Sequence, residues 1–164
     1  MTDGGNVPER GANGPSERAQ ELMIAFLNSV DIEEGTDEIT TPTELEAWAR
    51  ARGLTGGDLG QVRELRGALR SLASGEPVES PAASVPIRLT GGTVQAQAST
   101  VCEAVLASAF TLSIEGRLGR IRLCRAEDCA YAFYDRSRNG SRAWCDMGLC
   151  GNRAKARSYR ERRP

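Results

Sequence analysis

The 164-residue sequence contains no histidine, and it has one lysine against twenty arginines. Histidine is the commonest general base and a frequent metal ligand. Its absence removes the usual catalytic pairs and leaves any metal site to cysteine or carboxylate ligands. The sequence also lacks a glycine-rich phosphate loop and a paired-carboxylate motif. We therefore expect a protein that is not an enzyme.

Long apolar segments are missing as well. No run approaches the roughly 18 continuous apolar residues that a membrane-spanning helix requires. Residues 1–15 are rich in glycine and polar side chains, so we predict a disordered N-terminus without the apolar segment of a signal peptide. These features predict a protein of the cytoplasm with no membrane partner, in which thiols stay reduced and clustered cysteines indicate a metal site.

Charge is distributed unevenly along the chain. Residues 1–123 carry 11 basic and 17 acidic side chains, a net charge of −6, whereas residues 124–164 carry 10 basic and 5 acidic side chains, a net charge of +5. An acidic body followed by a basic tail predicts a polyanionic partner for the tail. A basic helix that only keeps the protein soluble fits the same composition.

Apolar periodicity predicts a mostly helical α+β body. Four segments carry the helical repeat of apolar residues, and they span 16–30, 43–52, 58–75 and 98–114. We place the first N-cap near Ser16, a capping box at Thr43 and Glu46, and a buried helix in the last segment, which is apolar on nearly every face. Alternating apolar residues around Gly91-Gly92 predict a β-hairpin over 85–96, and residues 120–123 predict a short strand. The acidic stretch 31–42 is predicted to be a loop.

Four of the five cysteines form two pairs. Each pair encloses four residues, and fifteen residues separate the pairs. Two such turns can present four thiolates to one tetrahedral ion. We therefore predict one structural Zn²⁺ with the ligands Cys124, Cys129, Cys145 and Cys150. An iron–sulfur cluster, or cysteines without any metal, are the alternatives that the spacing leaves open. The fifth, Cys102, lies in an apolar segment and is predicted to be a small buried side chain.

A zinc site with four protein ligands has no open position for water or substrate, which again argues against catalysis. The nearby aromatic side chains are predicted to pack around the metal as a small core, and they are Tyr131, Phe133, Tyr134 and Trp144. The segment 151–163 is predicted to be a basic helix that the metal fixes in place. We expect its side chains and those of the loop between the cysteine pairs to contact double-stranded DNA, with the candidate residues Arg138, Arg142, Arg153, Lys155, Arg157, Arg160 and Arg163.

Other functions fit the same residues. A zinc-stabilised module that docks on proteins is one, because the acidic body of one copy could attract the basic tail of another. A zinc–thiolate centre that releases its metal on oxidation is a second. RNA binding is a third and weaker one, because Tyr159 is the lone aromatic residue of the basic helix.

The segment FYDRSRNGSRAWCDMGLCGNRAKARSYRER resembles the CGNR zinc finger, named for the motif that here is Cys150-Gly151-Asn152-Arg153. Upstream, FLNSV at 26–30 and TPTELEAWARARGL at 41–54 resemble the ABATE domain that usually precedes this finger. The resemblance implies a bacterial transcription regulator linked to stress responses, with zinc at the four paired cysteines and DNA contact from Arg153 onward. It divides the chain into an ABATE-like α+β domain over 16–118 and a CGNR-type finger over 119–164. The first domain is expected to sense a small-molecule or protein effector or to form a homodimer.

Overall fold

The structure is a computed structural model that describes residues 14–78, 81–126 and 128–162. Arg163 and most of the N-terminal segment predicted to be disordered lie outside these residues. The described helices are α1 (Pro15–Leu27), α2 (Pro42–Arg50), α3 (Leu59–Ser74), α4 (Val101–Ile114) and α5 (Asn152–Glu161), with short helical turns η1 (Leu118–Arg120) and η2 (Met147–Gly151). The described strands pair as antiparallel hairpins, β1 (Val30–Asp31) with β2 (Thr36–Asp37), β3 (Ile87–Thr90) with β4 (Thr93–Ala96), and β5 (Ile121–Leu123) with β6 (Ala132–Tyr134). The predicted α+β class is confirmed.

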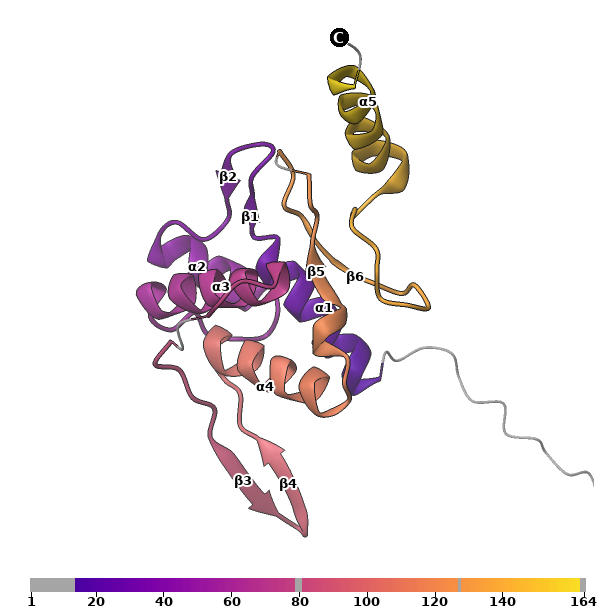
Figure 1. Cartoon of the computed structure of the whole chain (residues 1–164). Helices are drawn as coiled ribbons and strands as arrows, with labels where there is room; N and C mark the ends of the chain where they lie inside the picture. Colours follow the sequence, from indigo (N-terminus) through magenta and orange to yellow (C-terminus); the bar gives the residue numbers. More distant parts are fainter. Residues whose placement is uncertain (1–13, 79–80, 127, 163–164) are drawn as a thin grey trace, which may run out of the picture.

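The main core lies where α1, α3 and α4 meet (Figure 1). Its fully enclosed side chains include Phe26, Leu27, Val62, Val105 and Leu112. Each such side chain stabilises the fold by about 1.5–3 kcal/mol on leaving water. The predicted buried helix is α4, which buries seven of its fourteen residues in the structure, whereas Phe110 and Ile114 near its end are exposed. Among the described residues, no helix has both the length and the apolar character that crossing a bilayer requires.

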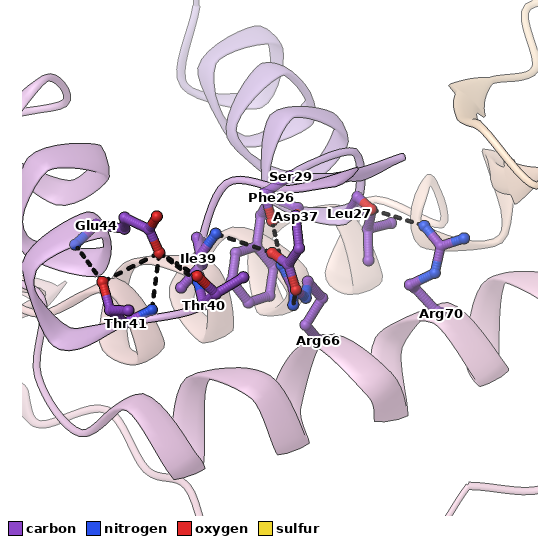
Figure 2. Close-up of polar contacts among 10 residues, drawn as sticks. All are labelled: Phe26, Leu27, Ser29, Asp37, Ile39, Thr40, Thr41, Glu44, Arg66 and Arg70. Carbon is purple, nitrogen blue, oxygen red and sulfur yellow. Dashed lines mark hydrogen bonds and ion pairs between the residues drawn. The ribbon is translucent and has the colours of Figure 1, made fainter. Parts of the chain in front are cut away.

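The ends of α2 and α3 follow from local side-chain chemistry. Asp58 caps α3 by accepting a hydrogen bond from Gln61 N, and Gly75 ends it in the left-handed region, as predicted. The capping box of α2 is formed by Thr41 and Glu44 instead of the predicted Thr43 and Glu46 (Figure 2). Pro42 explains the shift, since proline fits the first position of a helix and lacks the N–H that would need a partner there.

The acidic segment predicted to be a loop contains the short hairpin β1–β2, and Val30 belongs to β1 instead of the first helix. This hairpin is held by the guanidinium of Arg66 on α3, which is only 6% exposed. Arg66 donates to Asp37 Oδ1 at 2.8 Å, to Asp37 Oδ2 at 2.5 Å and to Ser29 Oγ at 2.7 Å. Figure 2 shows these groups lying together beside α3. The sequence pattern missed the strands because a contact 29 residues away stabilises them.

The hairpin β5–β6 joins the C-terminal part of the chain to this core. Ile121 and Ala132 are buried in the main cluster. The amide of Asn28, at the end of α1, donates to Ala132 O at 2.9 Å and accepts from Ala132 N at 2.7 Å, so it pairs with β6 as a neighbouring strand would. Arg70 on α3 donates to Leu27 O at 2.7 Å and to Ala130 O at 2.9 Å. The start of the cysteine-rich segment is therefore anchored on the body.

Replacing Arg66 with methionine keeps most of its volume but leaves the half-buried carboxylate of Asp37 without its ion pair. We expect the free energy of unfolding to fall by about 3 kcal/mol, because removal of one partner leaves the other charge uncompensated. Urea unfolding of the zinc-loaded protein measures this. The control Arg50→Met, at a side chain that is 77% exposed, should change stability by less than about 0.5 kcal/mol.

The same pair predicts a pH dependence. Burial acts to raise the pKa of Asp37, but hydrogen bonds from Arg66 and from Ile39 N outweigh it, so the pKa is lowered overall. The contribution of the pair is therefore complete above the carboxyl's unfolded pKa of about 3.9 and is lost as pH falls through its folded pKa. Arg66→Met should flatten this acidic limb of the stability curve. Equal stability of the two methionine variants would contradict this account.

Candidate metal centre

The four paired cysteines converge on one point. The Sγ atoms of Cys124, Cys129, Cys145 and Cys150 all lie within 4.8 Å of one another. Cys145 Sγ lies 3.7 Å from both Cys129 Sγ and Cys150 Sγ. Four thiolates at about 2.3 Å from a tetrahedral zinc ion are about 3.8 Å apart, so these distances suit that ion. Cys102 is buried elsewhere, in the main core.

Each knuckle is a turn closed by local hydrogen bonds. In the first, Cys129 N donates to Ala126 O at 3.0 Å, and Ala130 has a φ of 49°. In the second, the carboxylate of Asp146 accepts from Leu149 N at 2.9 Å and caps η2. Gly151 closes this turn, where an added Cβ would lie 3.2 Å from the Met147 side chain and 3.3 Å from Trp144 Cδ1. Glycine therefore allows a close approach that a larger residue would achieve only if these side chains shifted, and α5 starts at the next residue.

The chemistry of the sulfur cluster fits a bound cation. Burial raises the pKa of Cys129 to about 11 and also raises the pKa of Cys145. Several thiolates held this close repel one another and lose their hydration, so they ionise together only when a cation neutralises them. An all-thiolate, tetrahedral donor set favours zinc.

The predicted aromatic core around the metal was largely wrong. Trp144 does pack against the cysteine cluster together with Ala126. Tyr134 instead packs against the main core, and Tyr131 is 47% exposed. Phe133 lies beneath the guanidinium of Arg142, whose Cζ is 5.2 Å from the ring centroid. The alternation of side chains along β6 explains these positions, because neighbouring strand residues point to opposite faces. Ala132 and Tyr134 face the main core, and Phe133 faces Arg142.

Arg142 and Asp135 order the loop between the knuckles. Arg142 Nε donates to Trp144 O at 2.7 Å, and its Nη2 donates to Cys145 O. Asp135, which is fully buried, accepts from Ser137 N at 2.8 Å and from Arg142 N at 2.9 Å. The guanidinium predicted to contact DNA is therefore also a support for the second knuckle. No sequence pattern indicated a role for Asp135, since the hydrogen bonds that it accepts come from loop amides.

Arg153 connects three parts of the molecule. Its Nη2 donates to Cys150 Sγ at 3.4 Å, and its Nη1 lies 2.8 Å from Glu33 Oε1 and 3.4 Å from Asp128 Oδ2. Glu33 lies between β1 and β2, and Asp128 lies in the first knuckle. One turn further along α5, Arg157 Nη2 is 3.9 Å from Asp128 Oδ1. The start of α5 is thus tied to both the cysteine cluster and the body by contacts that span up to 120 residues.

The other candidate DNA contacts lie in two places. Lys155 and Arg160 are exposed on α5. Arg138 is exposed on the loop between the knuckles, where it lines a hollow with Arg117, Arg120 and Arg136. Arg163 lies outside the described residues. Of the predicted arginine face, Arg153 and Arg157 point toward acidic groups of the protein itself, whereas Arg160 is open to solvent.

An α+β body that carries four converging cysteine sulfurs before a basic helix defines a small zinc-finger protein. Residues 20–116 match the ABATE family model, which carries the description "Putative stress-induced transcription regulator", and residues 120–163 match the CGNR zinc finger. The first match spans more than half of the chain, and the protein therefore belongs to the ABATE family. Neither description is that of an enzyme family, and the predicted single structural zinc ion is confirmed. A search of curated proteins found no match.

Removal of zinc from the reduced protein by a chelator should affect the two ends of the cysteine-rich segment unequally. Amides of β5 and β6 should stay protected from hydrogen exchange, because Ile121 and Ala132 are buried in the main core. Amides over residues 145–162 should lose protection, since no large apolar cluster replaces the metal there. Mass spectrometry of exchange with and without chelator measures this, and added zinc should restore protection. Equal loss of protection in both segments, or no loss in either, would contradict the prediction.

Replacing Arg153 with alanine should weaken zinc binding by about 10-fold or more, because outer hydrogen bonds to metal ligands orient and stabilise them. Competition with a chromophoric chelator measures the affinity. Arg157→Ala is the matched control and should keep the wild-type affinity, because its contact with Asp128 at 3.9 Å does not involve a cysteine sulfur. Glu33→Gln should also keep it while increasing exchange in the first turn of α5. Wild-type affinity in Arg153→Ala would contradict the assigned role.

Proposed function

We propose that this protein is a transcription regulator that binds double-stranded DNA through α5, and that Cys124, Cys129, Cys145 and Cys150 are the ligands that hold its zinc ion. The observation that carries the proposal is the placement of α5. This ten-residue basic helix begins at Asn152, two residues after Cys150, and its far end projects away from the α+β body (Figure 1). At about 15 Å it is long enough to cross the major groove, which is about 12 Å wide.

The basic residues of α5 divide into two groups. Lys155 and Arg160 are exposed and can reach phosphates or base edges. Arg153 and Arg157 are 40% and 42% exposed and are paired with Asp128, so they set the direction of the helix and stay candidates for DNA contact at its near end. Arg163 remains a predicted contact beyond the described residues.

The loop between the knuckles supplies a second group of cations. Arg138 is exposed and suits a phosphate contact. Arg142, predicted to contact DNA, is held by the carbonyls of Trp144 and Cys145, and we propose that it acts on DNA mainly by shaping this loop. Bound zinc joins the two knuckles and neutralises part of the charge of the four thiolates. The remaining positive charge favours modest binding that is sensitive to salt.

We also propose that residues 16–118 act as a domain that senses an effector or forms a homodimer, that residues 119–164 form the DNA-binding module, and that the protein works in the bacterial cytoplasm in a stress response. The family names support this division. The shared core of α1, α3 and β5–β6 supports mechanical coupling between the two parts, because a shift of α3 would move Arg70 and the first knuckle together.

Genome-wide selection of bound DNA with the zinc-loaded protein tests the proposal. We expect a recurring duplex sequence, and we expect Cys145→Ser to lose zinc and DNA together. Capture of proteins in place of DNA, in amounts that survive nuclease treatment, would favour a docking module. If mild peroxide causes the protein to release both zinc and DNA, the regulator also contains a redox switch.

Salt titration on the selected duplex identifies the contacts. Arg160→Ala should make the slope of log K against log salt shallower by about one unit, because each phosphate contact releases about 0.9 counterions. Lys155→Ala should act in the same direction. The control Arg50→Ala, on the exposed face of α2, should leave the slope unchanged. A slope that is identical in all four proteins would rule out α5 as the contact surface.

A further inference from the structure

The β3–β4 hairpin projects away from the helices and does not enter the core (Figure 1). All eight of its strand residues are exposed. The register pairs Ile87 with Ala96 and Leu89 with Val94. Directly paired residues point to the same face of a sheet, so these four side chains form one apolar face, and Arg88, Thr90, Thr93 and Gln95 form a polar one.

The apolar face leaves three large side chains exposed to water, which is unfavourable. Ile87, Leu89 and Val94 are 60%, 72% and 68% exposed. An isolated two-stranded hairpin is marginally stable in water unless its apolar face is covered. Within the described part of the chain nothing buries this face. A surface outside the described residues is therefore needed to cover it.

A second exposed apolar surface lies on α4. Phe110 and Ile114 are one helical turn apart and are 61% and 69% exposed. The opposite side of α4 packs against α1 in the core. The chain thus carries both a projecting apolar arm and an uncovered apolar helix face.

We propose that these two surfaces belong to one interface between two copies of the chain. In this dimer, the apolar face of each hairpin covers Phe110 and Ile114 on α4 of the partner. A reciprocal exchange of this kind closes with two-fold symmetry and leaves neither surface unpaired. The proposal rests on the homodimer proposed above for residues 16–118, for which it names the interface, and it does not depend on DNA binding.

Area and charge both favour a second copy as the occupant. The five exposed apolar side chains present on the order of 600 Å² per copy, so two copies bury roughly 1,200 Å², the lower end of the range for specific interfaces. The hairpin carries a single charged residue, Arg88, and α4 carries a single one of opposite sign, Glu103. The two surfaces therefore meet without repulsion between like charges.

Sedimentation velocity of the zinc-loaded full chain, without DNA, tests the interface. Wild type should be a dimer whose fraction grows with concentration. The double variant Leu89→Asp/Val94→Asp should be a monomer at the same concentrations, and so should Phe110→Asp, with unchanged zinc content and circular dichroism. The control Thr90→Asp/Thr93→Asp places the same charges on a cross-strand pair of the polar face and should stay dimeric.

Photo-crosslinking gives an answer that does not depend on how these variants fold. Benzoylphenylalanine at position 89 of one copy should crosslink to a peptide containing Phe110 or Ile114 of an isotope-labelled second copy. A wild type that is monomeric throughout, a Leu89→Asp/Val94→Asp variant that remains dimeric, or crosslinks that avoid α4 would each overturn the proposal. DNA binding by a monomer would leave the proposed function standing, so the two failures are distinguishable.

Discussion

The C-terminal part of this protein is organised around four cysteine sulfur atoms that lie close enough to share one cation. Their Sγ atoms lie within 4.8 Å of one another, and burial raises the pKa of Cys129 and Cys145. Without a metal, such a cluster is a group of crowded thiols with few apolar neighbours. With zinc it becomes a crosslink between two loops, and α5 begins two residues after Cys150. The direction of the basic helix is therefore set by the geometry of the sulfur cluster.

Arginine does much of the structural work around this centre. Arg66 holds the β1–β2 hairpin, Arg70 joins α1 to the first knuckle, and Arg142 supports the second knuckle through two carbonyl groups. Arg153 joins α5, the cysteine cluster and the body. A planar guanidinium with several donors can satisfy two or three acceptors at once, which an ammonium group does less well. This explains how a chain with a single lysine uses its many arginines, several of which are supports and not available as contacts for a polyanion.

The two matched families meet in one core. The β5–β6 hairpin lies in the segment that matches the zinc finger, yet Ile121 and Ala132 are buried with α1 and α3, and Asn28 pairs with the edge of β6. A change in the packing of α3 therefore reaches the first knuckle through Arg70 without crossing a flexible linker. In a regulator, this shared core is the physical route by which the body and the finger can influence each other.

The sequence by itself determined the α+β class, the four-cysteine zinc site, the β3–β4 hairpin and the caps of α3. Each of these depends on residues close together in the chain or on regular spacing. The formation of β1, β2 and β6 depended on tertiary structure. Arg66 on α3 holds the β1–β2 hairpin, and Asn28 at the end of α1 pairs with β6. It also turned Arg153 toward Glu33 and placed Tyr134 against the body instead of the metal. Periodicity and spacing report local geometry, whereas the partner of a charged or edge group depends on how the whole chain packs.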